Sequence, residues 1–145
     1  MTSYWKPRWP NTVFFGSYKE LNYRIDVGRP AGPRLSVRTD GGPGFDLVLV
    51  KTEQGVVPEG HISEKAQSRW LDSDNAMQAA SSLLETHFSK IVAGRDRIEL
   101  HCSPEEEDIL PEGAQLTWCM SLVYRLWSSV PENERVKSKK ADFLE

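Results

Sequence analysis

The side chains of this chain best suited to nucleophilic or metal chemistry are Cys102, Cys119, His61, His87 and His101. Their spacing contains no Cys-x-x-Cys, His-x-His or His-Glu-x-x-His arrangement, the patterns typical of zinc and redox sites. His101 and Cys102 are neighbours in an alternating segment, so their side chains should point to opposite faces of a strand. This argues against a direct pair and predicts a buried Cys102 and an exposed His101. The sequence therefore indicates neither a catalytic centre nor a metal or cofactor site.

An acidic run lies close behind and consists of Glu105, Glu106, Glu107 and Asp108. Such a run could ligate a divalent cation or face a basic partner. It also follows Ser103 and Pro104, which completes a capping box with Ser at the N-cap and Glu at the third helical position. Carboxylates there interact favourably with the helix dipole. The pattern favours the start of a short helix, and the run remains a candidate partner-binding group.

The glycine-rich segment 40–44 (Asp-Gly-Gly-Pro-Gly) has the composition of a phosphate-binding loop but not its context. A phosphate loop precedes a helix and usually carries Lys-Ser or Lys-Thr. This segment instead precedes an apolar, strand-like run and has no such lysine. Its composition predicts a hairpin turn between two strands.

Aromatic and cationic residues are interleaved near the N-terminus in the segment 5–9 (Trp-Lys-Pro-Arg-Trp). Such residues can stack on the bases or sugars of a nucleic acid. The prolines exclude a regular helix and predict an extended arm over residues 1–10, whose tryptophans more often pack against protein. The net charge of −3 also disfavours a nucleic-acid partner.

The length and composition of the whole chain are those of one soluble domain. Its 145 residues, 39% hydrophobic and 27% charged, suffice for a hydrophobic core that needs no disulfides or bound metal for stability. The N-terminus does not resemble a signal peptide, no apolar run approaches the roughly 20 residues of a membrane span, and two cysteines make no disulfide framework. We expect a single domain over residues 1–145, located in the cytoplasm, with a polar, frayed tail over residues 132–145.

Alternation of apolar and polar residues predicts the strands. The clearest case is 21–27, where Leu21, Tyr23, Ile25 and Val27 alternate with polar residues. The other predicted strands are 11–16, 34–38, 45–50 and 97–102. The nearly all-apolar 45–50 run should lie in the sheet centre, whereas the glycines and proline of 52–60 predict turns.

Helical spacing begins near Ser63. Residues 63–66 can start one helical segment, and residues 72–75 (Asp-Ser-Asp-Asn) supply a second set of caps. The apolar residues after this set recur every three or four positions and predict a long helix through Val92 that ends at Gly94. Residues 115–130 fit a strand by alternation and a helix by their polar stripe. Their length and the following proline favour a helix.

Together these elements predict an α+β fold, with a mainly antiparallel sheet of about five strands and helices packed on one face. The predicted order is strand, strand, strand, strand, helix, strand, helix. If the apolar sides of the strands meet the helices, their polar sides form the opposite face. That face should carry Asn22, Arg24, Asp26, Arg34, Ser36, Arg38, Glu99 and His101. We expect it to be a partner-binding surface.

Charge is distributed unevenly: residues 1–52 carry eight Lys or Arg and four Asp or Glu, whereas residues 53–145 carry ten and seventeen. This asymmetry suits complementary faces within one fold or a charged partner. We therefore expect a small binding or inhibitor protein without cofactor, metal or membrane contact, most concretely a bacterial immunity or antitoxin-type protein that neutralises a toxin. The alternatives are an enzyme or ligand-binding domain with a site assembled from non-contiguous residues, and a subunit of an oligomer.

Overall fold

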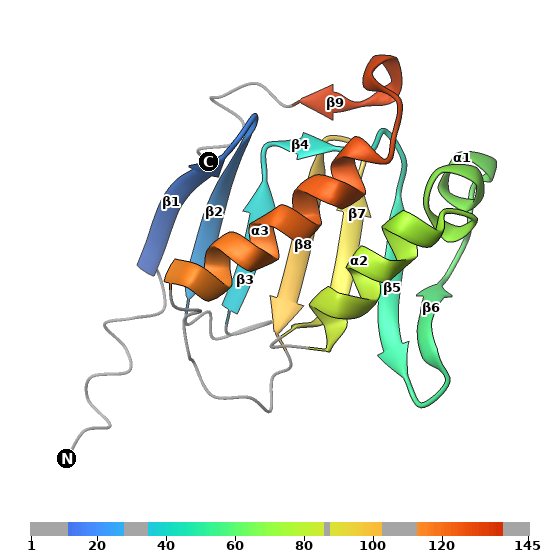
Figure 1. Cartoon of the computed structure of the whole chain (residues 1–145), viewed down its shortest axis with the longest axis horizontal. Coiled ribbons are helices and arrows are strands. Elements are labelled where there is room, and N and C mark those ends of the chain that lie inside the picture. Colours follow the sequence, from blue (N-terminus) through green and yellow to red (C-terminus); the bar gives the residue numbers. More distant parts are fainter. Residues whose placement is uncertain (1–11, 28–34, 86–87, 103–112, 138–145) are drawn as a thin grey trace.

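The computed structural model describes residues 12–27, 35–85, 88–102 and 113–137, which form a seven-stranded sheet with helices on one face (Figure 1). The strands are β1 (Thr12–Tyr18), β2 (Leu21–Val27), β3 (Leu35–Thr39), β5 (Leu47–Thr52), β6 (Gly55–Glu59), β7 (Phe88–Gly94) and β8 (Arg97–Cys102). A two-stranded sheet joins β4 (Gly41–Gly42) to β9 (Val136–Lys137). The helices are α1 (Glu64–Ala66), the π-helical turn η2 (Gln67–Leu71), α2 (Asp74–Leu84), α3 (Gly113–Ser128) and the 3-10 turn η3 (Glu132–Glu134). The predicted α+β class is confirmed, with seven strands in place of about five.

The large sheet is antiparallel throughout and has the order β1-β2-β3-β8-β7-β5-β6. The alternation predicted for β2 holds in part: Leu21, Ile25 and Val27 are buried and Asn22 is exposed. Tyr23, however, is only half-buried, and Asp26 on the polar side is buried as well. The same alternation holds in β3 and β8. One side of the sheet is therefore apolar because these residues recur with the period of the strand.

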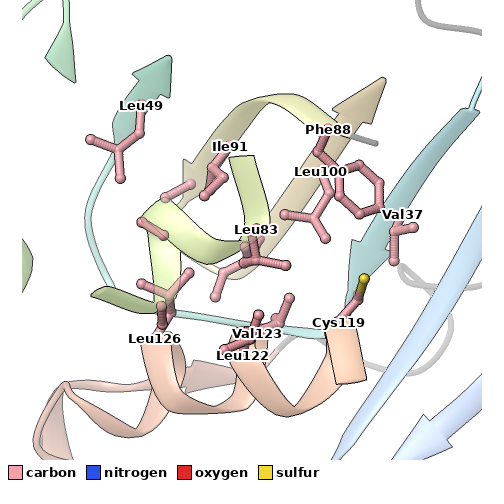
Figure 2. Close-up of a cluster of buried hydrophobic side chains, with 14 of the residues drawn as sticks. Val37, Leu49, Leu83, Phe88, Ile91, Leu100, Cys119, Leu122, Val123 and Leu126 are labelled. Carbon is pink, nitrogen blue, oxygen red and sulfur yellow. The ribbon is translucent and has the colours of Figure 1, made fainter. Parts of the chain in front are cut away.

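The helices α2 and α3 cover this apolar side (Figure 1). Figure 2 shows Leu83 of α2 and Leu122 and Leu126 of α3 among the sheet residues Leu49 and Leu100. The helical prediction for residues 115–130 is confirmed by α3. A buried apolar stripe on α3 explains why this stretch is helical although its residues also alternate.

Two serines start the helical segments, Ser63 where a start was predicted and Ser73 within the predicted cap set 72–75. The Ser63 hydroxyl accepts a hydrogen bond from the Ala66 N–H (3.1 Å), and the Ser73 hydroxyl accepts one from the Ala76 N–H (3.2 Å). Each bond satisfies a backbone donor that has no partner inside the first helical turn.

The C-terminal end of α3 is capped by a tryptophan from another element. Trp70 of η2 is fully buried and donates its indole N–H to the Leu126 carbonyl at 2.9 Å. That carbonyl is one of the last in α3 and needs a partner from outside the helix. The Trp70 ring also contacts the Phe45 ring edge to face, with ring centroids 5.2 Å apart.

The long helix predicted through Val92 is wrong beyond residue 84. α2 ends at Leu84, and residues 88–94 form the central strand β7 between β5 and β8. A bulge between Phe88 and Lys90 adds a residue to β7, so the buried side chains Phe88 and Ile91 are three positions apart. That spacing resembles helical periodicity, although the pairing with two neighbouring strands makes the segment extended.

The hairpin predicted at segment 40–44 is also wrong. β3 and β5 are separated in the sheet by β8 and β7, so residues 40–46 form a crossover along the end of the sheet. Within it, Gly41 and Gly42 pair with β9. A Cβ on Gly42 would overlap the backbone of Arg97, so this close approach requires glycine.

The turn-rich segment 52–60 contains a strand that the sequence did not predict. β6 pairs with β5 and forms an edge of the sheet. Pro58 is tolerated there because it lies in an edge strand, where a missing N–H need not break the ladder.

Part of the C-terminal tail predicted to be frayed is packed. Arg69 donates two hydrogen bonds to the Glu134 carboxylate (3.1 and 2.6 Å), and the Lys137 ammonium donates one to the Glu20 carbonyl (2.7 Å). Arg135 lies over the Trp127 ring at 4.8 Å. These contacts fix residues 132–137 against the domain, whereas residues 138–145 lie outside the described part, as does the predicted arm 1–10.

Candidate functional site

The candidate site is the sheet face opposite α2 and α3, which we call the open face (Figure 1). Directly paired residues of antiparallel strands share a face, so the strand register places two rows of side chains on it. One row runs Phe15, Arg24, Arg38, Glu99, Val92, Val48 and Glu59 from β1 to β6. The next row runs Val13, Asp26, Ser36, His101, Lys90, Val50 and Val57.

Five predicted site residues lie together on the open face. Arg24, Asp26, Arg38, Glu99 and His101 belong to β2, β3 and β8, which are adjacent in the sheet. We call these five the charged cluster. The other predicted residues, Arg34 and the acidic run from Glu105 to Asp108, lie outside the described residues.

Within the charged cluster, Arg24 and Asp26 form a close ion pair. Arg24 Nε and Nη2 both donate to the Asp26 carboxylate at 3.1 Å, from two positions away on the same strand. Their side chains are only 11% and 10% exposed. Hydrogen-bonded ion pairs with low exposure hold their geometry better than solvated pairs do.

Glu99 contacts two other side chains of β8. Its carboxylate accepts a hydrogen bond from Arg97 Nε and lies 3.0 Å from His101 Nε2. The hydrogen bond with His101 lowers the pKa of Glu99 below its usual 4.5, and Arg97 adds to the effect, although partial burial opposes it. Glu99 is therefore ionised at neutral pH and keeps His101 oriented across the sheet.

Arg38 lies at the centre of the charged cluster. The register places it directly opposite Arg24 on one side and Glu99 on the other. Cross-strand neighbours of like charge repel and those of unlike charge attract, each by less than about 1 kcal/mol. The cluster thus presents both charge signs at fixed positions.

A group of valines continues the open face beyond the charged cluster, and we call it the valine group. It consists of Val48, Val50, Val57 and Val92. All four are partly exposed, because no described helix lies on this side of the sheet. The apolar run 45–50 predicted a strand covered on more than one side, but its outward valines are covered by neither helix. This run was the available signal for Val48 and Val50 of the valine group.

Lys90 sits at the boundary between the two groups. The register places it between His101 of β8 and Val50 of β5. The bulge at the start of β7 brings it to this face. Since the sequence placed residues 88–92 in a helix, it gave no indication that Lys90 or Val92 belonged here.

Of the remaining chemistry-bearing residues, His87 lies outside the described part of the chain, and the others lie at separate places in the fold. Cys102 and Cys119 are buried in the core, and burial raises the pKa of Cys119 to about 11. His61 is exposed. Cys102 is buried and His101 lies on the opposite face, as predicted, but His101 is half-buried rather than exposed and lies beside Glu99. In the described part of the chain, no three His, Cys, Asp or Glu side chains gather as metal ligands would.

Asn22 was predicted on the same face but has a structural partner. Its backbone N–H and side-chain amide both donate to the carboxylate of Asp40, at 3.0 and 2.8 Å. Asp40 is buried, and its pairing with Asn22 ties the crossover that follows β3 to β2.

None of the helices that the structure describes is long and apolar enough to cross a membrane. Comparison with known proteins gives no relative for this chain: no family model, no curated protein and no solved structure matches it.

Proposed function

We propose that this chain is a small binding protein that acts by covering a surface of another protein with its open face. The observation that carries the proposal is the adjacency, on one sheet face, of the valine group and the charged cluster. Protein interfaces combine an apolar centre with a polar rim that has fixed hydrogen-bonding groups. The open face has both parts side by side.

The contacts inside the charged cluster support a recognition role. Arg24 is held by Asp26, and His101 by Glu99, before any partner arrives. Side chains that are already ordered lose less conformational entropy on binding, so more of the contact energy remains as affinity. The two charge signs also supply selectivity, because a partner with the wrong charge pattern is repelled.

The concrete form of the proposal is a cytoplasmic immunity or antitoxin-type protein that neutralises a toxin by occupying its surface. A small acidic domain with an uneven charge distribution suits this role. Such a protein needs a stable scaffold and one preformed face, and it needs no chemistry of its own. This form of the proposal rests on analogy with the class of small inhibitor proteins, and the expected partner is a protein of complementary charge.

The test uses Lys90→Glu and a matched control, Lys51→Glu. Both substitutions reverse a charge on the sheet, but Lys51 is exposed near the β5–β6 turn and lies off the open face. The partner is first captured from a lysate of the source organism and identified by mass spectrometry. Its affinity for each purified variant is then measured by calorimetry. We expect Lys90→Glu to weaken binding at least about tenfold and Lys51→Glu to leave it unchanged.

A second pair of measurements concerns the apolar part of the face. Val92→Glu places a carboxylate in the valine group and should weaken binding by a similar factor or more. If the protein is an immunity protein, wild type and Lys51→Glu should protect cells that express the captured toxin, whereas Val92→Glu should not. Binding that withstands both Lys90→Glu and Val92→Glu, with the fold intact by circular dichroism, would refute the proposed face.

A further inference from the structure

The segment after α3, residues 132–137, returns to the crossover between β3 and β5, and we call it the C-terminal strap (Figure 1). It contains η3 and β9. Its backbone pairing in the described chain joins Gly41 to Lys137 and Gly42 to Val136. A ladder of two residues on each strand is marginal by itself, since even longer isolated hairpins are barely stable in water. Side-chain contacts are therefore needed to hold the strap in place.

These side-chain contacts are mostly charged. The Arg69 guanidinium donates to the Glu134 carboxylate at 3.1 and 2.6 Å, and the two side chains are 38% and 17% exposed. The Lys137 ammonium lies 3.9 Å from the Asp40 carboxylate. Ion pairs with this access to solvent are weakened by dissolved salt. The attachment of the strap should therefore depend on ionic strength.

Trp127 lies where the strap meets the domain. The Arg135 guanidinium lies over its ring, 4.8 Å from the centroid. Gly41, which pairs with the strap, lies against the indole nitrogen, where an added Cβ would be 3.2 Å away. Trp127 is 5% exposed, and its indole N–H has no acceptor in the described chain. A buried donor without an acceptor costs free energy because it has lost its water, so this N–H opposes the closed position of the strap.

Trp70 is the internal comparison for Trp127. It is fully buried, and its indole N–H donates to the Leu126 carbonyl at 2.9 Å. This hydrogen bond joins η2 to the end of α3, so water can reach the Trp70 N–H only when these helices separate. The two indole N–H groups therefore distinguish an opening of the strap from an unfolding of the domain.

We propose that the C-terminal strap opens as a unit while the sheet, α2 and α3 stay folded, and that ionic strength sets the population of the open state. Opening breaks the pairing of β4 with β9, withdraws Arg135 from the Trp127 ring and admits water to the indole N–H. Surface segments can open locally at a small fraction of the free energy of global unfolding. The strap contacts Arg69, Asp40 and Trp127, which belong to neither the charged cluster nor the valine group. This device therefore goes beyond the proposed function and does not depend on it.

The test is hydrogen exchange of the isotope-labelled full chain, followed by NMR. The strap is observed through the backbone N–H groups of Glu134 and Arg135, which are hydrogen-bonded within the turn η3, and through the Trp127 indole N–H. We expect these three protons to show similar protection. We also expect them to exchange at least about 100-fold faster than the Trp70 indole N–H, which exchanges only when the domain unfolds.

Salt and one pair of variants test the charged contacts. Raising sodium chloride from about 0.1 to about 1 M shortens the Debye length from about 10 Å to about 3 Å, and exchange of the strap protons should become about three- to tenfold faster. Glu134→Gln removes the ion pair with Arg69, so it should speed this exchange at low salt and reduce the effect of added salt. The control Glu132→Gln removes the same charge from the same turn. Glu132 is exposed and has no described side-chain contact, so exchange should be as in wild type.

Exchange of the Trp127 indole N–H at the rate of the Trp70 indole N–H would overturn the proposal, because the strap would then open only with the whole domain. Strap amides without any protection would also overturn it, since the strap would not be closed in solution. The same holds if salt has no effect on the strap protons, or if Glu132→Gln acts like Glu134→Gln. If circular dichroism shows that Glu134→Gln unfolds the chain, the salt series on wild type decides the question alone.

Discussion

The two buried tryptophans of the core should respond differently to the same substitution. Trp70 is fully buried and donates to the Leu126 carbonyl at 2.9 Å. Trp127 is 5% exposed, and within the described chain its indole N–H has no hydrogen-bond partner. Replacement by phenylalanine removes the same atoms from both sites, so the loss of packing is similar. The difference in the free energy of unfolding between the two variants therefore measures the contribution of the hydrogen bond from Trp70 to the Leu126 carbonyl.

The expected magnitudes follow from these contacts. Trp70→Phe leaves a buried carbonyl at the end of α3 without its partner, which costs about 1–3 kcal/mol beyond the lost packing. Trp127→Phe removes a donor that satisfies no acceptor, so its hydrogen-bond term is zero or favourable. It does weaken the contact with the Arg135 guanidinium, by less than about 1 kcal/mol. We therefore expect Trp70→Phe to be the more destabilising by about 1–2 kcal/mol.

The assay is urea denaturation followed by far-ultraviolet circular dichroism, because tryptophan fluorescence itself changes in these variants. Equal denaturant slopes would show that the free energies of unfolding can be compared directly. If Trp127→Phe is as destabilising as Trp70→Phe, or more so, the assignment of Trp70 as the cap of α3 is wrong.

Three further outcomes are expected. Glu99→Gln should lower the free energy of unfolding at pH 7 by about 1 kcal/mol. Because the pKa of Glu99 is depressed in the folded protein, wild type should lose this advantage as the pH falls below 4.5 and through the lower folded-state pKa. In urea denaturation from pH 7 to acid, the control Glu59→Gln, at an exposed edge position, should leave the free energy of unfolding and its pH dependence as in wild type. Cys119 should resist alkylation at pH 8 until urea unfolds the chain, because burial raises its pKa to about 11. Mass spectrometry can follow the alkylation, and rapid labelling of Cys119 in the native protein would contradict its burial. Gly42→Ala should lower the melting temperature strongly because the added Cβ would overlap the Arg97 backbone. The control Gly113→Ala should be tolerated, since no atom lies within 4 Å of the added carbon. Equal melting temperatures of the two variants would show that the crossover is not tightly packed.

The candidate site was predictable where local alternation identifies a strand. Arg24 and Arg38 lie on strands whose apolar residues occupy every second position, so the opposite face follows from the period alone. The contact partners of these two residues could not be predicted from the sequence, because the register between strands depends on segments that are distant in the chain. Asn22, for example, faces Asp40 of the crossover and is a structural contact.

The valine group shows the limit of local reasoning more clearly. Val92 was assigned to a helix because the bulge at the start of β7 gives its buried neighbours helical spacing. Neither Val92 nor Lys90 could then be placed on a sheet face. The order β3-β8-β7-β5 decides this outcome, since it makes β7 a central strand with two hydrogen-bonded neighbours.

The sequence by itself determined the fold class, the helix starts at Ser63 and within residues 72–75, and the direction of each side chain in β2, β3 and β8. These features depend on interactions within a few residues, such as a hydroxyl on a nearby N–H or the two-residue period of a strand. Only the tertiary structure decided the strand order, the end of α2, the existence of β6 and the joining of charged cluster and valine group. Such features depend on backbone pairing between segments far apart in the chain, and the free energy of that pairing is greater than the preferences of any short segment.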